Sequence, residues 1–446
     1  MLKRTKARIL LSAIPATALI TWFAIQTIQS PPQYIETLLC VAVVFLLLIF
    51  AWIRLVPHLI SYMLGEENIL KERVGARTYR RCGARELCRI LIIALLIRLL
   101  QFVMTYVVHF LAFGYTDTFF VIQRIWLEFY DPAVSFPLYH WISHIFWVVS
   151  YNFNHARFLT SYLFTGLAVT ALYYWVYQGY DRPIARRAIK YFFLFPASCL
   201  LMGTLPDGLF LVLSIFCLLF IARKRFIWSN VFAMLACLTH PFGILLLVPS
   251  LLSYAQTLLK EYRLHQSVTK KYVSDQVWNA VSYLLFPIAI GIVLLYSMVQ
   301  FGSAGRLFEQ IFTAEAGSGL FGTLISSLDQ AFAQLRATTS AEAFMSWFEM
   351  GSVLLMAIIF VCILIFAIGK IRTSYALYML LFVGTVVMGP FAKESARLLL
   401  MCAPLFLSMS LIANRKWRDG LFTILGVLAS VTFFVTFILG YTQYGG

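Results

Sequence analysis

Residues 36–56, ETLLCVAVVFLLLIFAWIRLV, contain an uncharged and almost wholly apolar run from Thr37 to Ile53. About 20 apolar residues are enough for a helix to cross the hydrocarbon core of a bilayer. Runs of this kind recur along the 446 residues, of which 61% are hydrophobic and only 12% charged. Soluble domains are about 25% charged. We therefore predict an all-α, polytopic transmembrane helical bundle that forms a single domain over residues 1–446.

About thirteen spans are expected, since short or broken helices are tolerated inside a bundle. The first apolar run, which follows Arg8, is long enough to span, so we interpret it as an uncleaved helix rather than a signal peptide. The predicted spans lie at 9–29, 36–56, 89–113, 157–178, 190–205, 207–222, 226–239, 242–258, 278–299, 348–369, 374–390, 398–413 and 420–441.

The formal charge of +16 is explained by membrane topology rather than by nucleic-acid binding, because the basic residues are distributed between apolar runs. With a cytoplasmic N-terminus, most of the 35 basic residues fall in cytoplasmic segments, as the positive-inside rule requires. The exceptions are Arg98, Arg124, Arg157, Arg306, Arg336, Lys393 and Arg397. The compact loops favour a bacterial plasma membrane over the endoplasmic reticulum.

Two longer segments face away from the cytoplasm in this topology. Residues 114–156 have apolar stretches too short to span, which predicts interfacial or re-entrant helices. Residues 300–347 contain several glycines among Phe and Leu, and either a mobile lid or an ordinary surface loop is consistent with that composition.

Asp117 is the first candidate for chemistry, because it follows the third predicted span directly in GYTDTFF, residues 114–120. A carboxylate at the membrane boundary can act as a general base when partial burial raises its pKa. A helix cap or a surface charge is the alternative. Further polar motifs follow on the same side: Asp131-Pro132, SFPLY at 135–139, TLPDGLF at 204–210, LTHPFG at 238–243 and SARLLL at 395–400.

In order and spacing these motifs resemble the GPI mannosyltransferase 2 (PIG-V) family, including its bacterial members, within the GT-C class of membrane glycosyltransferases. The resemblance spreads over residues 117–404. The chain departs from the family pattern at five positions: Thr116 stands for Trp, Ser135 for Phe, His140 for Pro, Asp207 for Glu and His240 for Arg.

The resemblance implies transfer of a hexose, most plausibly mannose, from a polyprenyl-phosphate donor to an extracytoplasmic hydroxyl, with inversion. Asp117 would be the general base. The acceptor would be a glycan, a glycolipid or a protein. Cations for the departing phosphate would come from Arg397, His240, Lys393 and Arg124, and contacts to sugar or acceptor from Asp207 and Asp131.

Several alternatives stay open at this stage. Arg397 could be a boundary residue paired with Glu394, and Asp207 could be a turn residue of Pro-Asp-Gly. No cofactor is assigned, although a divalent metal is open because the three aspartates could converge. For His140 and His144, four residues apart, we favour packing over metal binding because a third ligand is not evident.

The main rival function is a transporter or lipid-carrier flippase, which would favour charged residues at mid-membrane within broken helices. A catalytically inactive scaffold is a third reading. Arg98, inside the third predicted span, either serves a function or extends its charge to the cytoplasmic interface.

Overall fold

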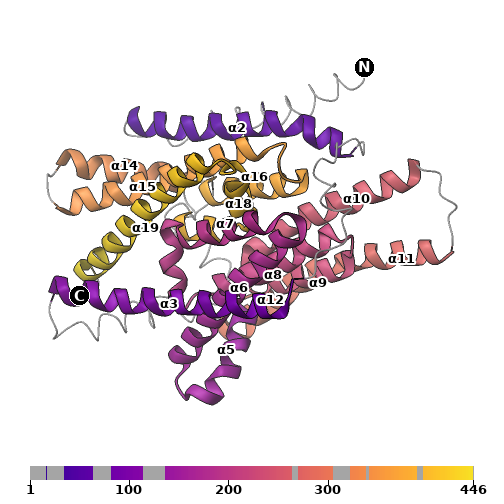
Figure 1. Cartoon of the computed structure of the whole chain (residues 1–446), viewed down its shortest axis with the longest axis horizontal. Coiled ribbons are helices and arrows are strands. Elements are labelled where there is room, and N and C mark those ends of the chain that lie inside the picture. The colour runs from indigo at the N-terminus through magenta and orange to yellow at the C-terminus, as the bar shows by residue number, and fades with distance from the viewer. Residues whose placement is uncertain are drawn as a thin grey trace. The chain divides into compact units, whose positions relative to one another are not determined.

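The computed structural model describes Thr17 and residues 35–63, 82–113, 136–263, 270–304, 322–337, 341–388 and 395–444. Every regular element in these ranges is a helix (Figure 1). The all-α prediction is therefore confirmed for the described part of the chain. The chain divides into two compact units, each described here by itself. Unit 1 comprises Met1–Lys71, Leu251–Gln266 and Phe308–Leu399, and unit 2 comprises Glu72–Ser250, Ser267–Leu307 and Leu400–Gly446.

Unit 2 holds most of the described helices. Its α-helices are α3 (Ala84–Phe113), α5 (Pro137–Ser150), α6 (Phe153–Gly179), α7 (Arg182–Phe193), α8 (Asp207–Ala222), α9 (Phe226–Cys237), α11 (Lys270–Val281), α12 (Leu285–Phe301), α18 (Ala403–Ile412) and α19 (Lys416–Tyr444). Three short 3-10 helices connect them: η2 (Pro196–Met202), η3 (Pro241–Leu246) and η4 (Ser282–Leu284).

Unit 1 is built around α2 (Ile35–Met63), which packs against α14 (Gly322–Ala337), α15 (Ala341–Ala367) and α16 (Thr373–Met388). An exposed ion pair joins Glu36 to Arg336 at 2.6 Å. Gly369 follows α15 at a φ of 89°, a left-handed conformation that favours glycine, and lies beside His58. Two helices, α10 (Leu247–Arg263) and α17 (Ser395–Leu400), belong partly to each unit.

Within the described ranges, six helices are long and apolar enough to cross a membrane. They are Ile35–Met63, Ala84–Val108, Phe153–Gly179, Pro241–Lys260, Val273–Phe301 and Lys416–Val435. Shorter apolar helices cover Asp207–Ala222, Phe226–Cys237, Leu354–Ala367, Thr373–Val387 and Ala403–Ile412. These positions agree with a membrane-embedded helical protein. The predicted span at 9–29 lies outside the described residues, and the total of thirteen stays a prediction.

Two of the predicted spans are not continuous helices. In 190–205, α7 ends at Phe193 and η2 begins at Pro196, because the residue before a proline is driven to extended backbone and Phe195 adopts it. In 398–413, α17 ends at Leu400 and α18 begins at Ala403. Broken helices of this kind are tolerated where neighbouring helices satisfy the freed backbone groups.

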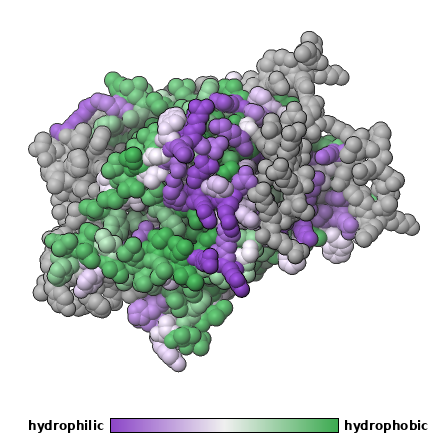
Figure 2. All heavy atoms as spheres, viewed as in Figure 1, coloured by the Kyte–Doolittle hydropathy of each residue, from purple (hydrophilic) through white to green (hydrophobic). Residues whose placement is uncertain are grey.

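Large apolar side chains remain on the outside of the helices. On the face drawn in Figure 2, apolar residues (green) cover broad areas. The long helices of unit 2 carry many exposed apolar side chains, including Ile92, Leu96, Leu100, Leu295, Val299, Ile424 and Leu428. Exposed apolar surface on this scale is unfavourable in water and favourable against lipid tails.

Helices α6 and α8 form the centre of unit 2 and run in the same direction. Near the start of α8, a Cβ on Gly208 would lie 2.7 Å from the Thr165 hydroxyl of α6. At the other end, the Arg223 guanidinium donates to Tyr174 at 3.2 Å and to Gln178. Helix α9 then runs back beside α8, as the ring contacts of Phe216 and Phe220 with Phe232 indicate.

Polar side chains gather at the end of unit 2 where α6 and α8 finish. We name this end, which holds Arg182, Gln178 and Arg223, the basic end. There, Arg182 forms an ion pair with Glu86 at the start of α3. From Arg157 to Gln178, α6 rises about 30 Å at about 1.5 Å per residue, which is close to the thickness of the bilayer core.

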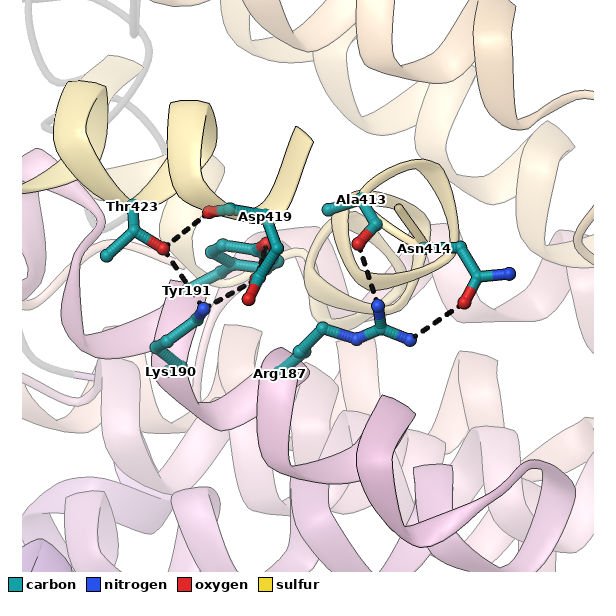
Figure 3. A network of polar contacts seen from close by, with 7 residues as sticks. All are labelled: Arg187, Lys190, Tyr191, Ala413, Asn414, Asp419 and Thr423. Atoms are coloured by element: carbon teal, nitrogen blue, oxygen red, sulfur yellow. Dashed lines mark hydrogen bonds and ion pairs between the residues drawn. The ribbon is translucent and has the colours of Figure 1, made fainter. Parts of the chain in front are cut away.

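A second polar network ties α7 to α18 and α19 (Figure 3). Lys190 donates to Asp419 and, at 3.0 Å, to Thr423, and the Tyr191 hydroxyl donates to the same Asp419 carboxylate. Arg187 donates to the carbonyl oxygen of Ala413 at 2.7 Å. Helix α7 carries its basic residues on one face and buries Ala185, Ala188 and Phe192 on the other, so its polar face is held by specific partners.

Candidate functional site

Three motifs that lie far apart in the sequence meet in unit 2, at the end opposite the basic end. The backbone N–H of Leu138 donates to the carbonyl oxygen of Leu238 at 3.0 Å. The ring of His240 stacks on that of Phe136, with centroids 6.5 Å apart, and the ring of Phe210 approaches His240 edge-on at 5.6 Å. Residues 136–139, 204–210 and 238–243 thus form one cluster, which we name the motif end.

Asp207 is the first residue of α8 and is fully buried. The N-terminal turn of a helix has unsatisfied N–H groups and the positive end of the helix dipole, both of which stabilise a carboxylate there. The neighbouring Gly208 allows α6 and α8 to approach closely, because a Cβ at this position would lie 2.8 Å from the Thr165 backbone nitrogen. An exposed turn is therefore not the environment of Asp207.

His240 is held in a fixed orientation between aromatic rings. It is 8% exposed, and its Nδ1 accepts from the backbone N–H of Phe242 at 3.3 Å. Because Nδ1 accepts, Nε2 carries the hydrogen of the neutral imidazole and is a donor. Gly243 makes the turn compact, since a Cβ there would come within 2.3 Å of the Cys237 nitrogen. The Nε2–H group of His240 is therefore a donor whose position is fixed by the Phe242 backbone and the surrounding rings.

Arg157, which the sequence marked only as an exception to the charge bias, belongs to the same region. It lies in the first turns of α6 and is 1% exposed. Its carbonyl oxygen accepts from the Tyr139 hydroxyl at 3.0 Å, and its guanidinium carbon lies 5.9 Å from the Phe153 ring centroid. In the sequence, the signal that could have identified it was an arginine close to a motif on the lysine-poor side.

His140 and His144 come together on α5, with their Nε2 atoms 3.0 Å apart. Both rings contact Phe153, at centroid distances of 5.3 and 5.0 Å. The described residues contain no group of three or more His, Cys, Asp or Glu side chains that could hold a metal ion. The pair is thus held against an aromatic ring, and the choice between packing and ligand binding stays a prediction.

The other predicted site residues fall into two groups. Asp117, Arg124, Asp131 and Lys393 lie outside the described residues. Arg397 is half-buried on α17 and belongs to unit 1, whereas Asp207 and His240 belong to unit 2. The structure thus brings Asp207 and His240 to the motif end and leaves the other five assignments as predictions.

Arg98 is not a snorkelling residue, because its side chain is only 1% exposed. Its Nη1 donates to Gln101 at 2.8 Å and to the carbonyl oxygen of Ser198 in η2. The guanidinium carbon also lies within 6 Å of the ring centroids of Phe192 and Phe193. The charge is thus enclosed where α3 meets the break between α7 and η2.

Comparison with protein-family models finds no match to this chain, and comparison with curated proteins finds none either. The family resemblance of the motifs therefore stays a prediction, and the function is argued from the site.

Proposed function

We propose that this chain is an integral membrane glycosyltransferase of the GT-C type, which moves a hexose from a polyprenyl-phosphate donor to an acceptor hydroxyl. The observation that carries the proposal is the contact of the His240 ring with both Phe136 and Phe210, which joins three motif segments, and Asp207 is buried in one of these segments. Their segments were singled out by motif alone. The segments 204–210 and 238–243 flank the antiparallel pair α8 and α9, so these two meet because the helices pack together. The pairing of α8 with α9 does not explain the contact between Phe136, which precedes α5, and His240, which follows α9.

The reaction needs a base for the acceptor and cations for the leaving phosphate. The acceptor oxygen attacks the anomeric carbon as its proton passes to Asp117. The bond between that carbon and the phosphate oxygen breaks, and the electron pair leaves with the polyprenyl phosphate. Attack from the face opposite the phosphate inverts the anomeric centre. Mannose is the proposed sugar because of the family resemblance.

The motif end supplies groups that suit this chemistry. The Nε2 donor of His240 is held by aromatic contacts and by the Phe242 backbone, so little reorganisation is needed when negative charge develops on a phosphate. Asp207 offers a buried carboxylate to sugar or acceptor hydroxyls, and Asp131 is proposed for the same task. Arg397, Lys393 and Arg124 are proposed as further phosphate contacts.

The two ends of unit 2 support a sided enzyme. Lysine and arginine residues near helix ends are retained in the cytoplasm, so the basic end with Arg182 and Arg223 is proposed to face it. The motif end would then face the opposite side. Because two spans are predicted before α3, we propose with it a cytoplasmic N-terminus, in a bacterial plasma membrane by preference.

A transporter or lipid-carrier flippase is the second candidate, and one observation favours it. Arg98 is a buried charge within a membrane helix, and it contacts η2 beside the break after α7. Charged residues at broken helices mark the substrate sites of many transporters. The first candidate is preferred because Asp207 begins α8 and His240 immediately precedes η3, so both lie at helix termini and not within a helix as Arg98 does.

The deciding experiment is transfer of labelled sugar from polyprenyl-phosphate-mannose in membranes that contain wild-type protein, Asp117→Asn, Asp207→Asn or Asp275→Asn. Asp275 is exposed on α11, so its variant controls for the loss of one carboxylate. We expect transfer to fall by about 100-fold or more in the first two variants and to be unchanged in the third. Equal transfer in all four would contradict the proposed site.

If no protein transfers sugar, uptake of labelled lipid phosphate into proteoliposomes separates the candidates. Uptake that is abolished by Arg98→Met and retained in Asp117→Asn would support the transporter instead. Retention of the detergent-extracted size and of thermal stability is required for each variant before its activity is compared.

A further inference from the structure

Three basic side chains meet where α5 packs against the start of α6. They are His140 and His144, one helical turn apart on α5, and Arg157 on α6. The Nε2 atoms of the two histidines lie 3.0 Å apart and share a hydrogen bond, in which one ring donates and the other accepts. Phe153, at the start of α6, holds both rings from one side.

The local charge at this junction favours an anion. Burial and the neighbouring charges of His144 and Arg157 lower the pKa of the His140 imidazole. Within the described chain, the groups that act electrostatically on His140 are thus both basic. Its buried Nδ1 also has no hydrogen-bond partner among the described residues. A phosphate placed here would meet the positive charge of Arg157 and an imidazole pair that can bind a proton, both of which attract oxyanions.

The rest of α5 indicates what the anion would be attached to. Tyr139 and Ser143 are buried, whereas Trp141, Ile145 and Val148 are large apolar side chains exposed on the helix. At about 100° per residue, His140 and His144 fall between the buried face and this apolar flank. A ligand that joins a phosphate to a hydrocarbon tail fits both surfaces at once, whereas a soluble phosphate would use only the first.

A metal ion is the less suitable ligand for the same residues. Zinc is usually held by three or four protein ligands, and the described residues contain no such group. The guanidinium of Arg157 acts electrostatically on His140, so it would also repel a cation bound beside that ring. The same charge attracts a phosphate.

We propose that His140, His144 and Arg157 form a second phosphate-binding site for a lipid phosphate, in addition to the contacts proposed for the reaction, with the exposed apolar flank of α5 lying along the first part of its hydrocarbon tail. This inference rests on the proposed function in one respect, because the lipid phosphate would be the donor or the carrier released from it. The aromatic contacts of His140 and Trp141 with Tyr296 on α12 fix this edge of the site.

The test is binding of polyprenyl phosphate to the full chain in nanodiscs of zwitterionic lipid, followed by thermal unfolding at increasing ligand. The matching polyprenol and inorganic phosphate are measured in parallel. We expect polyprenyl phosphate to raise the unfolding temperature of the wild type, and polyprenol to have little effect. In His140→Gln/His144→Gln the apparent Kd should rise about 10-fold or more, since charge-assisted hydrogen bonds are lost.

His155→Gln is the matched control, because His155 is exposed in the first turn of α6 and its variant should bind as the wild type does. An unchanged affinity in the double variant overturns the inference. So does stabilisation by zinc chloride without stabilisation by the lipid phosphate. Equal affinity for inorganic phosphate overturns the assignment to a lipid. Arg157→Lys, which keeps the charge, should bind more tightly than Arg157→Gln.

The sugar-transfer assay tests the proposed function separately from this inference. Lipid-phosphate binding that depends on the two histidines in a protein without transferase activity would support the site and contradict the glycosyltransferase. If the wild type transfers sugar and the double histidine variant binds the lipid phosphate normally, the glycosyltransferase is supported and the site is contradicted.

Discussion

The backbone N–H of Leu138 donates to the carbonyl oxygen of Leu238, and this bond joins the start of α5 to the turn after α9 across 100 residues of chain. Because backbone atoms make the bond, it sets the distance between the two motifs independently of their side chains. The stacked rings of Phe136 and His240 follow from that spacing. Main-chain geometry thus helps to position the residues of the motif end.

The two nitrogens of His240 can be tested separately. In His240→Asn the amide oxygen can still accept from the Phe242 N–H, as Nδ1 does at 3.3 Å, but the distant donor is lost. In His240→Gln the amide nitrogen reaches the position of Nε2, and the contact with Phe242 is lost. If His240 stabilises the leaving phosphate, sugar transfer should fall by about 100-fold in the Asn variant and less in the Gln variant. The reverse order would assign His240 to turn stability.

Gly208 should be intolerant of any side chain. A Cβ there would lie 2.7 Å from the Thr165 hydroxyl and 2.8 Å from the Thr165 nitrogen, so α6 and α8 would have to separate. We expect Gly208→Ala to destabilise the chain by about 1–3 kcal/mol, as overpacking does, seen as a lower unfolding temperature in detergent. Gly291→Ala on α12 is the control, since its Cβ would meet nothing within 4 Å. Equal unfolding temperatures for the two variants would contradict the close approach.

The helical architecture was largely predictable because hydrophobicity and length decide it. The described helices α2, α3, α6, α12 and α19 all fall on predicted spans. The continuity of a helix was not predictable where local chemistry interrupts an apolar run. Pro196 breaks the segment 190–205 although its composition is that of a span. The burial of Arg98 could not be read either, because it depends on the carbonyl oxygen of Ser198, far along the chain.

The candidate site was predictable as a set of motifs and not as an arrangement. The sequence marked Asp207 and His240, and their shared environment depends on how α8 and α9 pack. Arg157 was missed because its significance comes from Tyr139, whose hydroxyl reaches its carbonyl oxygen only after α5 folds against α6. The division into compact units also depends on tertiary contacts, which the helical periodicity of a sequence does not reveal.

The network around Asp419 should contribute to stability and not to catalysis. Its carboxylate accepts from Lys190 and Tyr191, on a helix that also binds α18 (Figure 3). We expect Asp419→Asn to lower the free energy of unfolding by about 1 kcal/mol, because the pair is one-third exposed and partly screened. Sugar transfer per folded protein should be unchanged. Asp275→Asn serves again as the control, and loss of transfer in a stable Asp419→Asn protein would place this network in the mechanism.

The His140 pair predicts a particular pH dependence of stability. Burial, then His144, then Arg157 lower the pKa of His140 below its ordinary 6.5. The folded chain therefore binds a proton there less readily than the unfolded chain. Above pH 6.5 neither state is protonated at this group. As the pH falls below 6.5 the unfolded state takes up the proton first, so the free energy of unfolding declines until the lowered pKa is passed.

Unfolding temperatures of wild type and His140→Gln, measured from about pH 7.5 to about pH 5.5 across the usual titration range of histidine, test this dependence. The wild type should lose more stability over that interval than the variant, and His155→Gln should behave as the wild type does. Polyprenyl phosphate should reduce the loss, because an anion beside His140 stabilises its protonated form and the bound protein then takes up the proton too. A wild type whose stability rises on acidification without ligand would mean that His140 faces a negative partner, and would contradict the charge assigned to this junction.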